Sequence, residues 1–139
     1  MEHLSLIGLG IIQEAKEFAA RIGELPKEER IVVLNEARLA LHEVSPFRDE
    51  PVDCVLRVPA DEVEANDYNP NVVAPPEMRL LEIPIEADGF TQPIVTFPTN
   101  GHREVVDGFH RNLVGKRSKK VSKRLGGYLP VTTIRSDRQ

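Results

Sequence analysis

The first third of the chain has the hydrophobic periodicity of α-helices. Apolar residues recur there at three- and four-residue steps, at Leu4, Ile7, Ile11, Ala15, Phe18, Ala19 and Ile22. This spacing places them on one face of a helix. A second helix follows the break at "ELPKEER" and should end near His42, because the residue before Pro46 avoids the helical region. The pattern predicts a helical hairpin over residues 1–45, whose apolar stripe packs on the rest of the chain or on a second copy, with a separate partner as the alternative.

The pattern changes after this hairpin. Residues 52–59, "VDCVLRVP", alternate and are rich in β-formers, which predicts a strand. Residues 60–76, "ADEVEANDYNPNVVAPP", predict a long loop because Asn-Pro and Pro-Pro steps interrupt regular structure. The next segment, "EMRLLEIPIEADG", predicts a helix that Pro84 kinks or shortens and Gly89 ends.

The C-terminal part alternates strands with helical periodicity. "QPIVTF" and "HREVVD" flank Asn100-Gly101, a pair favoured in tight turns, and predict a β-hairpin. One helix should begin after Gly108 and end at Gly126-Gly127, before a last strand at "YLPVTTI". The predicted fold class is α+β.

Composition indicates one compact core with an appendage. The chain has 139 residues, of which 40% are hydrophobic and 29% charged, as in ordinary globular proteins. Cys54 is the single cysteine, which excludes an internal disulfide framework or a CxxC metal site. The N-terminal apolar run is too short for a membrane span and lacks a basic leader region, so a cytoplasmic protein without a membrane segment is expected.

Charge is divided unevenly along the chain. Residues 1–100 carry 8 Lys or Arg and 19 Asp or Glu, a net charge of −11, and residues 101–139 carry 10 and 3, a net charge of +7, which gives −4 in total. This asymmetry indicates that an anionic ligand meets the C-terminal third. The alternative is that the two parts of the chain neutralise each other.

The segment "VVDGFHRNLVGK", residues 105–116, carries the clearest chemical signal. A strand that passes through Asp-Gly into a helix presents the first N–H groups of that helix to an anion. Gly108 leaves room beside the backbone, Arg111 offers a planar fork for phosphate oxygens, and His110 is a further donor. The segment predicts a phosphate site; the alternative is an ordinary turn, in which Asp107 caps the helix and both cationic side chains are solvated.

The helix after this turn is basic. Six charged residues, Lys116, Arg117, Lys119, Lys120, Lys123 and Arg124, spread around most of it. They are candidates for contact with the phosphates of a nucleic acid. A solvated face that balances the acidic part of the chain is favoured over this, because no aromatic residues interleave with the charges to stack on bases.

Several blocks follow one another in a familiar order: "VLRVPADEVEANDYNPN", "LLEIPIEADGFTQPIVTF", "EVVDGFHR" and "RLGGYLPVTTI". Over about 80 residues they resemble the ParB/sulfiredoxin superfamily. "SPFRDEPVDCVL", "ANDYNPN", "APPEMRLLE" and "DGFTQPIV" look like its IbrB-like branch, described as ParB-like co-activators of prophage gene expression. The resemblance implies a small mixed sheet with helices over residues 55–139, joined to the helical hairpin by residues 46–54.

The resemblance also implies a site. In that superfamily the matching Gly-x-x-Arg or Gly-x-His-Arg turn binds the phosphates of ATP or CTP, a nucleotide that Mg²⁺ can accompany. It therefore assigns Gly108, His110 and Arg111 to the phosphate-binding site, and Asp107 is included in that site. It places five further residues at the same pocket: Asn69, Asn71, Thr91, Gln92 and Pro93.

Departures from the family's patterns decide which activities carry over. Phe109 stands where sulfiredoxins have a catalytic cysteine, and a phenyl ring cannot attack a phosphoryl group, which excludes sulfiredoxin activity. It also replaces the glutamate of CTP-hydrolysing ParB clamps. Asn69 and Pro70 stand where related free-serine kinases have a glutamate base, and neither residue accepts a proton. No catalytic residue and no metal ligand is assigned, since no DxD or His/Asp cluster stands out.

Together these observations predict a ParB-like nucleotide-binding regulatory module in DNA-associated or prophage transcription regulation. An ATP-dependent kinase of the serine type, another NTPase or a ParB-like nuclease is the alternative. By resemblance, the expected partners are a nucleotide, DNA and a phosphoadenosine-phosphosulfate-reductase-like protein; the apolar stripe is compatible with a homodimer. Because "TTIRSDRQ" follows a core strand so closely, the chain is interpreted as the N-terminal part of a longer protein.

Overall fold

A computed structural model describes residues 3–65 and 75–135. By its internal contacts the chain divides into two compact units, Met1–Ala40 and Leu41–Gln139. The domain limits inferred from the sequence, at 1–45, 46–54 and 55–139, stay a prediction. Within the described ranges, no helix is both long and apolar enough to cross a membrane.

The N-terminal part of the chain consists of the two helices that the sequence predicts. Helix α1 (Leu6–Gly23) begins at Ser5, whose Oγ accepts a hydrogen bond from the Gly8 N–H at 3.0 Å. Helix α2 (Lys27–Glu43) follows, and Arg30 donates to the carbonyl oxygens of Gly23 and Leu25 at 2.8 and 2.9 Å, which braces the connection. Most of the apolar stripe of α1 is exposed, including Ile7 and Ile11 at 77% and 57%.

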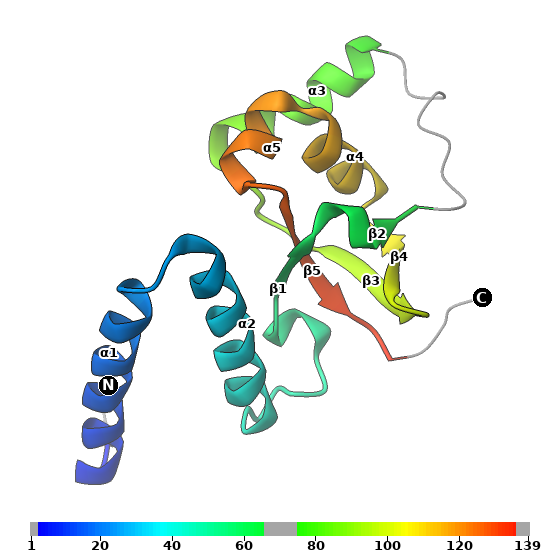
Figure 1. Cartoon of the computed structure of the whole chain (residues 1–139). Helices are drawn as coiled ribbons and strands as arrows, with labels where there is room; N and C mark the ends of the chain where they lie inside the picture. The colour runs from blue at the N-terminus through cyan, green and yellow to red at the C-terminus, as the bar shows by residue number, and fades with distance from the viewer. Residues whose placement is uncertain (1–2, 66–74, 136–139) are drawn as a thin grey trace. The chain divides into compact units, whose positions relative to one another are not determined.

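The second unit is built on a five-stranded mixed sheet with the strand order β1-β5-β3-β4-β2 (Figure 1). The pairs β1–β5 and β3–β4 are antiparallel, whereas β3–β5 and β2–β4 are parallel. This architecture confirms the predicted α+β class. The strands are β1 (Leu56–Pro59), β2 (Val63–Glu64), β3 (Ile94–Thr99), β4 (His102–Asp107) and β5 (Tyr128–Thr133).

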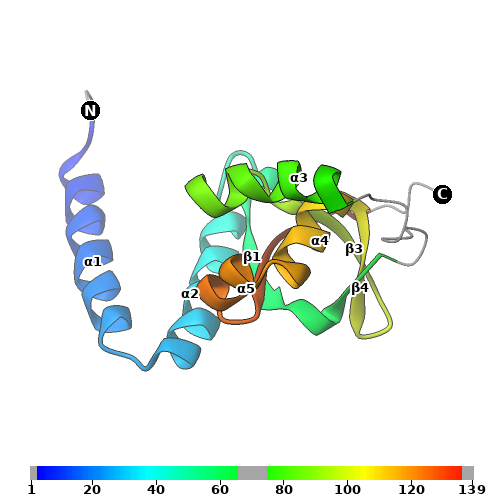
Figure 2. The same ribbon diagram turned by 90° about the horizontal axis from the view of Figure 1, so that it is seen from above.

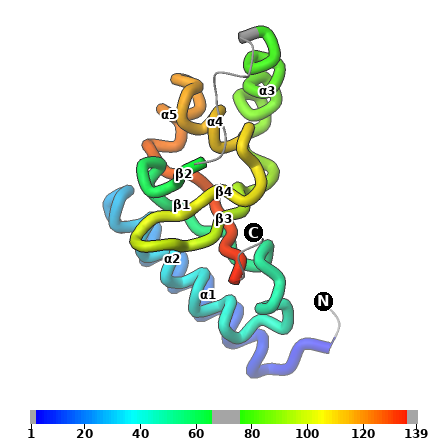
Figure 3. The backbone as a smooth tube through the Cα atoms, turned by 90° about the vertical axis from the view of Figure 1, so that its right-hand side faces the viewer, coloured from blue at the N-terminus to red at the C-terminus, as the bar shows by residue number. Residues whose placement is uncertain are grey.

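Three helices lie together beside this sheet, two of them in contact with its strands and the third packed on those two (Figure 3). They are α3 (Pro75–Asp88), α4 (Phe109–Arg117) and α5 (Lys119–Leu125), and α3 runs alongside the other two (Figure 2). Phe109 and Leu125, from α4 and α5, pack against a buried cluster of mostly β-branched side chains that fit a pleated surface. Its members are Val58, Val63, Ile94, Val105, Leu129 and Val131.

The predicted hairpin is confirmed and the region before it needs correction. Asn100 and Gly101 have positive φ angles of 44° and 84°, as a two-residue turn between twisted strands requires. The strand expected at 52–59 begins only at Leu56, because residues Pro51–Asp53 form a 3₁₀ helix. The loop expected at 60–76 holds a second 3₁₀ helix, Ala60–Glu62, and strand β2, which gains its hydrogen bonds from the distant β4.

Two helix predictions also need correction. Helix α3 continues through Pro84 to Asp88, so proline does not shorten it, while a kink there stays a prediction. The helix also begins earlier than expected, at Pro75, because a first helical turn does not need the N–H groups that proline lacks. The single helix expected from Gly108 to Gly126 is two helices that meet at Ser118. The backbone of Ser118 is extended, with ψ 117°, and its Oγ accepts a hydrogen bond from the Val121 N–H at 3.3 Å, which caps α5.

Close packing of α4 on the sheet depends on Gly115, which is buried. A Cβ added at this position would lie 2.5 Å from Cδ2 of Leu129 and 3.3 Å from Cζ of Phe90. Leu129 is only 1% exposed, so its side chain has no open space into which it can move. Gly115 therefore sets the distance at which α4 packs on β5.

We predict that Gly115→Ala lowers the free energy of unfolding by about 1–3 kcal/mol through overpacking, although alanine is the better helix former. Gly10→Ala is the matched control, since nothing lies within 4 Å of a Cβ built there in α1. That substitution should leave stability unchanged or raise it by up to about 1 kcal/mol. Urea denaturation of both variants tests this; equal effects at the two positions would contradict the packing role.

Candidate anion-binding site

The predicted phosphate turn joins the end of β4 to the start of α4. Asp107 is the last residue of β4, and Gly108 is the N-cap of α4. Gly108 has φ 92° and ψ 32°, a left-handed conformation that is unfavourable for residues with a Cβ atom. The requirement for glycine at this position is therefore conformational.

The guanidinium of Arg111 lies directly beside Gly108. A Cβ on Gly108 would be 2.8 Å from Nη2 and 3.0 Å from Nε of Arg111. The space beside the glycine, which the sequence suggested for a ligand, is taken by the protein's own cation, and Gly108 is buried. The missing side chain of Gly108 thus lets Arg111 fold back over the first turn of α4.

Two side chains hold the Arg111 guanidinium. Nη1 donates to Oε1 of Gln92 at 3.1 Å, and Nη2 lies 4.0 Å from Oδ2 of Asp107. The Arg111 side chain is 25% exposed, and its buried Nε has no hydrogen-bond partner among the described residues. The segment before β3, the end of β4 and the first turn of α4 therefore converge on one cation.

This arrangement favours an anion. The first turn of a helix carries partial positive charge, and a guanidinium placed there adds to it. The compensating carboxylate, Asp107, is 72% exposed, so water screens its attraction for Arg111. The Gly108 N–H donates to Oδ1 of Asp107 at 2.9 Å, so an incoming anion competes with that carboxylate for the backbone donor.

Asn112 is a further polar residue at this end of α4, and the sequence offered no signal for it. It is only 4% exposed, and its Oδ1 has no hydrogen-bond partner within residues 3–65 and 75–135. Periodicity alone does not distinguish a buried asparagine from a solvated one. Two buried polar atoms without partners, Arg111 Nε and Asn112 Oδ1, thus belong to consecutive residues of the first turns of α4.

The other predicted site residues are placed as follows. Gln92 joins the turn through its bond to Arg111, and His110 is exposed. Thr91 is exposed and Pro93 is half-buried, and no hydrogen bond links either to the turn in the part of the chain that is described. Two predicted residues, Asn69 and Asn71, lie outside the described residues.

Two of the six basic candidates for nucleic-acid contact form hydrogen bonds to backbone carbonyl groups of the protein, although their residues are exposed. The Lys116 ammonium donates to the carbonyl oxygen of Val63, and burial there lowers the pKa of Lys116. Arg124 donates to the carbonyl oxygens of Ile85 and Glu86 at 2.7 and 2.9 Å, which ties α5 to the end of α3. The remaining four are exposed as well: Arg117, Lys119, Lys120 and Lys123.

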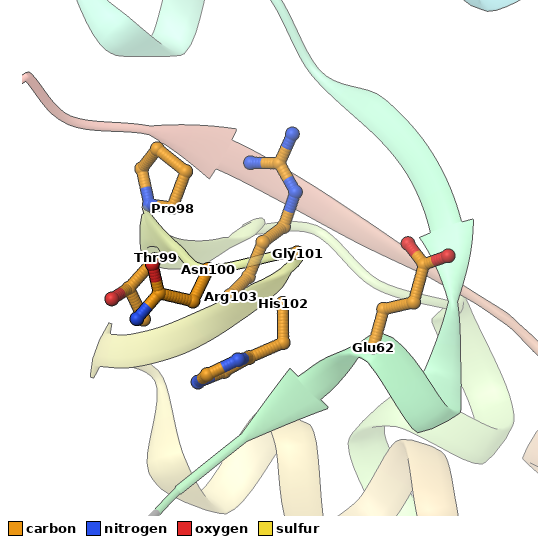
Figure 4. A pocket seen from close by; sticks show the side chains of 7 residues that line it. All are labelled: Glu62, Pro98, Thr99, Asn100, Gly101, His102 and Arg103. Carbon is orange, nitrogen blue, oxygen red and sulfur yellow. The ribbon is translucent and has the colours of Figure 1, made fainter.

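A separate pocket of about 370 Å³ lies at the tip of the β3–β4 hairpin (Figure 4). Strand β4 runs from this tip at His102 to the turn at Asp107, so the pocket and the turn lie at opposite ends of one strand. Among the described residues, no group of three or more His, Cys, Asp or Glu side chains is arranged to hold a metal ion.

Comparison with known proteins gives one close sequence relative. The chain is 53% identical over 129 residues to the Escherichia coli (strain K12) protein YbdM, described as uncharacterized. The match covers 92% of this chain and 60% of YbdM, so the chain spans about three fifths of that relative's length. No family model matches the chain.

Three solved structures are similar over parts of the chain. One is the C-terminally truncated chromosome-partitioning protein ParB from Caulobacter crescentus complexed with CTP-γ-S, with 21% identity and a TM-score of 0.45 over 60% of this chain and 46% of that one. The truncated SbnI from Staphylococcus aureus has 25% identity and a TM-score of 0.46 over 63% of this chain and 33% of that one. Sulfiredoxin from Arabidopsis thaliana has 15% identity and a TM-score of 0.41 over 59% of this chain and 85% of that one.

We predict that Gly108→Ala destabilises the protein for two separable reasons. Alanine in a left-handed conformation costs about 1–2 kcal/mol, and displacement of the Arg111 guanidinium from Gln92 adds about 1 kcal/mol. Gly89→Ala is the control, because Gly89 has φ +80° and nothing within 4 Å of its Cβ position. Urea denaturation should show the larger loss for Gly108→Ala; equal losses would mean that Arg111 does not depend on the missing side chain.

Proposed function

We propose that the chain is a nucleotide-binding regulatory module, whose turn from Asp107 to Arg111 holds the phosphates of ATP or CTP. The observation that carries the proposal is the Arg111 guanidinium, held beside Gly108 at the positive end of α4. A guanidinium fork and a helix N-terminus together match the charge and shape of a phosphate group. The sequence resemblance to the ParB/sulfiredoxin superfamily supports the same turn.

Each residue of the turn has a role in this proposal. Arg111 grips two phosphate oxygens, and the backbone N–H groups of the first turn of α4 complete the contact. His110, which is exposed, donates to a further oxygen. Gln92 orients Arg111, and Asp107 leaves the Gly108 N–H when the anion arrives or holds a Mg²⁺ ion that accompanies it. Four further residues border the nucleotide: Asn69, Asn71, Thr91 and Pro93.

The regulatory part of the proposal rests on the resemblance to the IbrB-like branch. In this proposal nucleotide binding alters contacts with DNA or with a phosphoadenosine-phosphosulfate-reductase-like protein in the cytoplasm. The exposed cations Arg117, Lys119, Lys120 and Lys123 are the candidates for DNA phosphates. In this proposal the turn contacts only phosphates, so residues outside the turn determine whether ATP or CTP binds.

The first test is nucleotide binding by isothermal calorimetry, with ATP and CTP, each with and without Mg²⁺. Arg111→Gln should weaken binding about 10- to 100-fold, because a hydrogen-bonded charge pair contributes about 1.5–3 kcal/mol. Arg48→Gln is the matched control; it removes the same charge from an exposed position in another turn and should change affinity less than about twofold.

Two results would contradict the proposal. One is no heat of binding for either nucleotide at millimolar concentration. The other is an equal loss of affinity in the Arg48 and Arg111 variants, which would mean that total charge, and not the turn, attracts the nucleotide.

A second test concerns the carboxylate that now accepts from Gly108. Asp107→Asn keeps the shape of the side chain and removes its charge, so without Mg²⁺ it should tighten nucleotide binding about fivefold. With Mg²⁺ present the gain should shrink or reverse, because the variant loses a ligand for the ion. Weaker binding in both conditions would show that the carboxylate supports the bound anion and does not compete with it.

A further inference from the structure

The pocket at the tip of the β3–β4 hairpin has its own charged side chains. It has a volume of about 370 Å³ and lies between the turn residues of the hairpin and Glu62. Figure 4 shows Arg103 between these two groups, while His102 extends to the other side of the strand. The pocket lies roughly 17 Å from Gly108 along β4, by the usual rise of a strand. It is therefore independent of the phosphate turn.

Neutral oxygen atoms fix the Arg103 guanidinium in this pocket. Its Nη1 donates to Oγ1 of Thr133 at 2.7 Å and to Oγ1 of Thr96 at 3.2 Å. Thr96 is fully buried, and its hydroxyl donates to the Thr132 carbonyl at 2.8 Å, so only its lone pairs remain to face Arg103. Side chains of β3 and β5 thus set the direction of a cation that belongs to β4.

The charge of Arg103 lacks a direct counterion among the described residues, where its hydrogen bonds are those to the two threonines. Burial lowers the pKa of Arg103 and the attraction of Glu62 raises it, but an arginine remains protonated in either case. The neutral hydroxyls orient the guanidinium without cancelling its charge. A half-buried, preoriented cation that borders a cavity is a binding group for an anion.

The lining of the pocket restricts the kind of anion. Glu62 places a negative charge in the same cavity, which repels a phosphate dianion more than a monoanion. Thr99 and Asn100 supply neutral donors, and His102 is occupied by Glu64, with Nε2 and Oε2 3.3 Å apart. A planar carboxylate matches the free edge of a guanidinium fork and carries a single charge.

We propose that this pocket binds the carboxylate group of a small organic acid, with Arg103 as the principal contact and Glu62 as the group that excludes dianions. The site goes beyond the proposed nucleotide function and shares no side chain with it. A signal at this pocket and a signal at the phosphate turn can therefore be observed separately in one sample.

The probe is sodium propionate, titrated at constant ionic strength into the full chain while amide chemical shifts are recorded by NMR. We expect saturable shifts at Gly101, His102 and Arg103 with a Kd on the order of 1–10 mM, as is reasonable for one charged contact and few heavy atoms. Any shifts at residues 107–112 report anion binding at the separate phosphate turn and should persist in Arg103→Gln. Absence of saturable shifts at the hairpin tip, with sodium chloride as the blank, would overturn the proposal.

Two variants and a control complete the test. Arg103→Gln should abolish the propionate shifts, whereas Arg79→Gln, on the exposed face of α3, should leave them unchanged. Glu62→Gln should tighten propionate binding about fivefold and allow inorganic phosphate to shift the same amides. Glu62→Gln tests the proposal even if Arg103→Gln perturbs the fold. Weaker propionate binding in Glu62→Gln would contradict the assigned roles.

Discussion

The candidate site depends on one steric constraint, the absence of a Cβ at Gly108. A left-handed glycine at the N-cap of α4 leaves a space that the Arg111 guanidinium fills, 2.8 Å from where the first side-chain atom would stand. The guanidinium is then held at the N-terminus of a helix, so its positive charge lies beside the partial positive charge of the helix dipole. An exposed carboxylate, Asp107, offsets them only in part. The turn thus keeps an excess of positive charge, which is the basis of the phosphate contact that we propose.

Local sequence signals predicted the elements that local physics determines. Helix α1 followed from three- and four-residue apolar steps, and helix α2 followed from the break at "ELPKEER" and the stop before Pro46. The hairpin followed from Asn100-Gly101, whose positive φ angles few other pairs tolerate. Elements that depend on distant partners were missed. Strand β2 exists because β4 supplies its hydrogen bonds, and the break at Ser118 comes from a cap that competes with helix continuation.

The same distinction applies to the candidate site. Gly108 and Arg111 lie within one turn of each other, so their proximity followed from the order of residues along the chain. Resemblance suggested Gln92, and the structure places it on Arg111 from 19 residues away. Asn112 and Arg103 had no signal, because their significance lies in burial and in contacts with other strands. Strand β4 thus carries a cationic site at each end, one for phosphate and one for carboxylate, in the functions that we propose.

The most direct measurement is a crystal structure of the full chain grown with CTP or ATP. We expect phosphate oxygens within hydrogen-bond distance of the Arg111 guanidinium and of backbone N–H groups in the first turn of α4, with the Asp107 carboxylate withdrawn from the Gly108 N–H. A nucleotide bound elsewhere, with Gly108 still donating to Asp107 and Arg111 still folded over the glycine, would contradict the central claim.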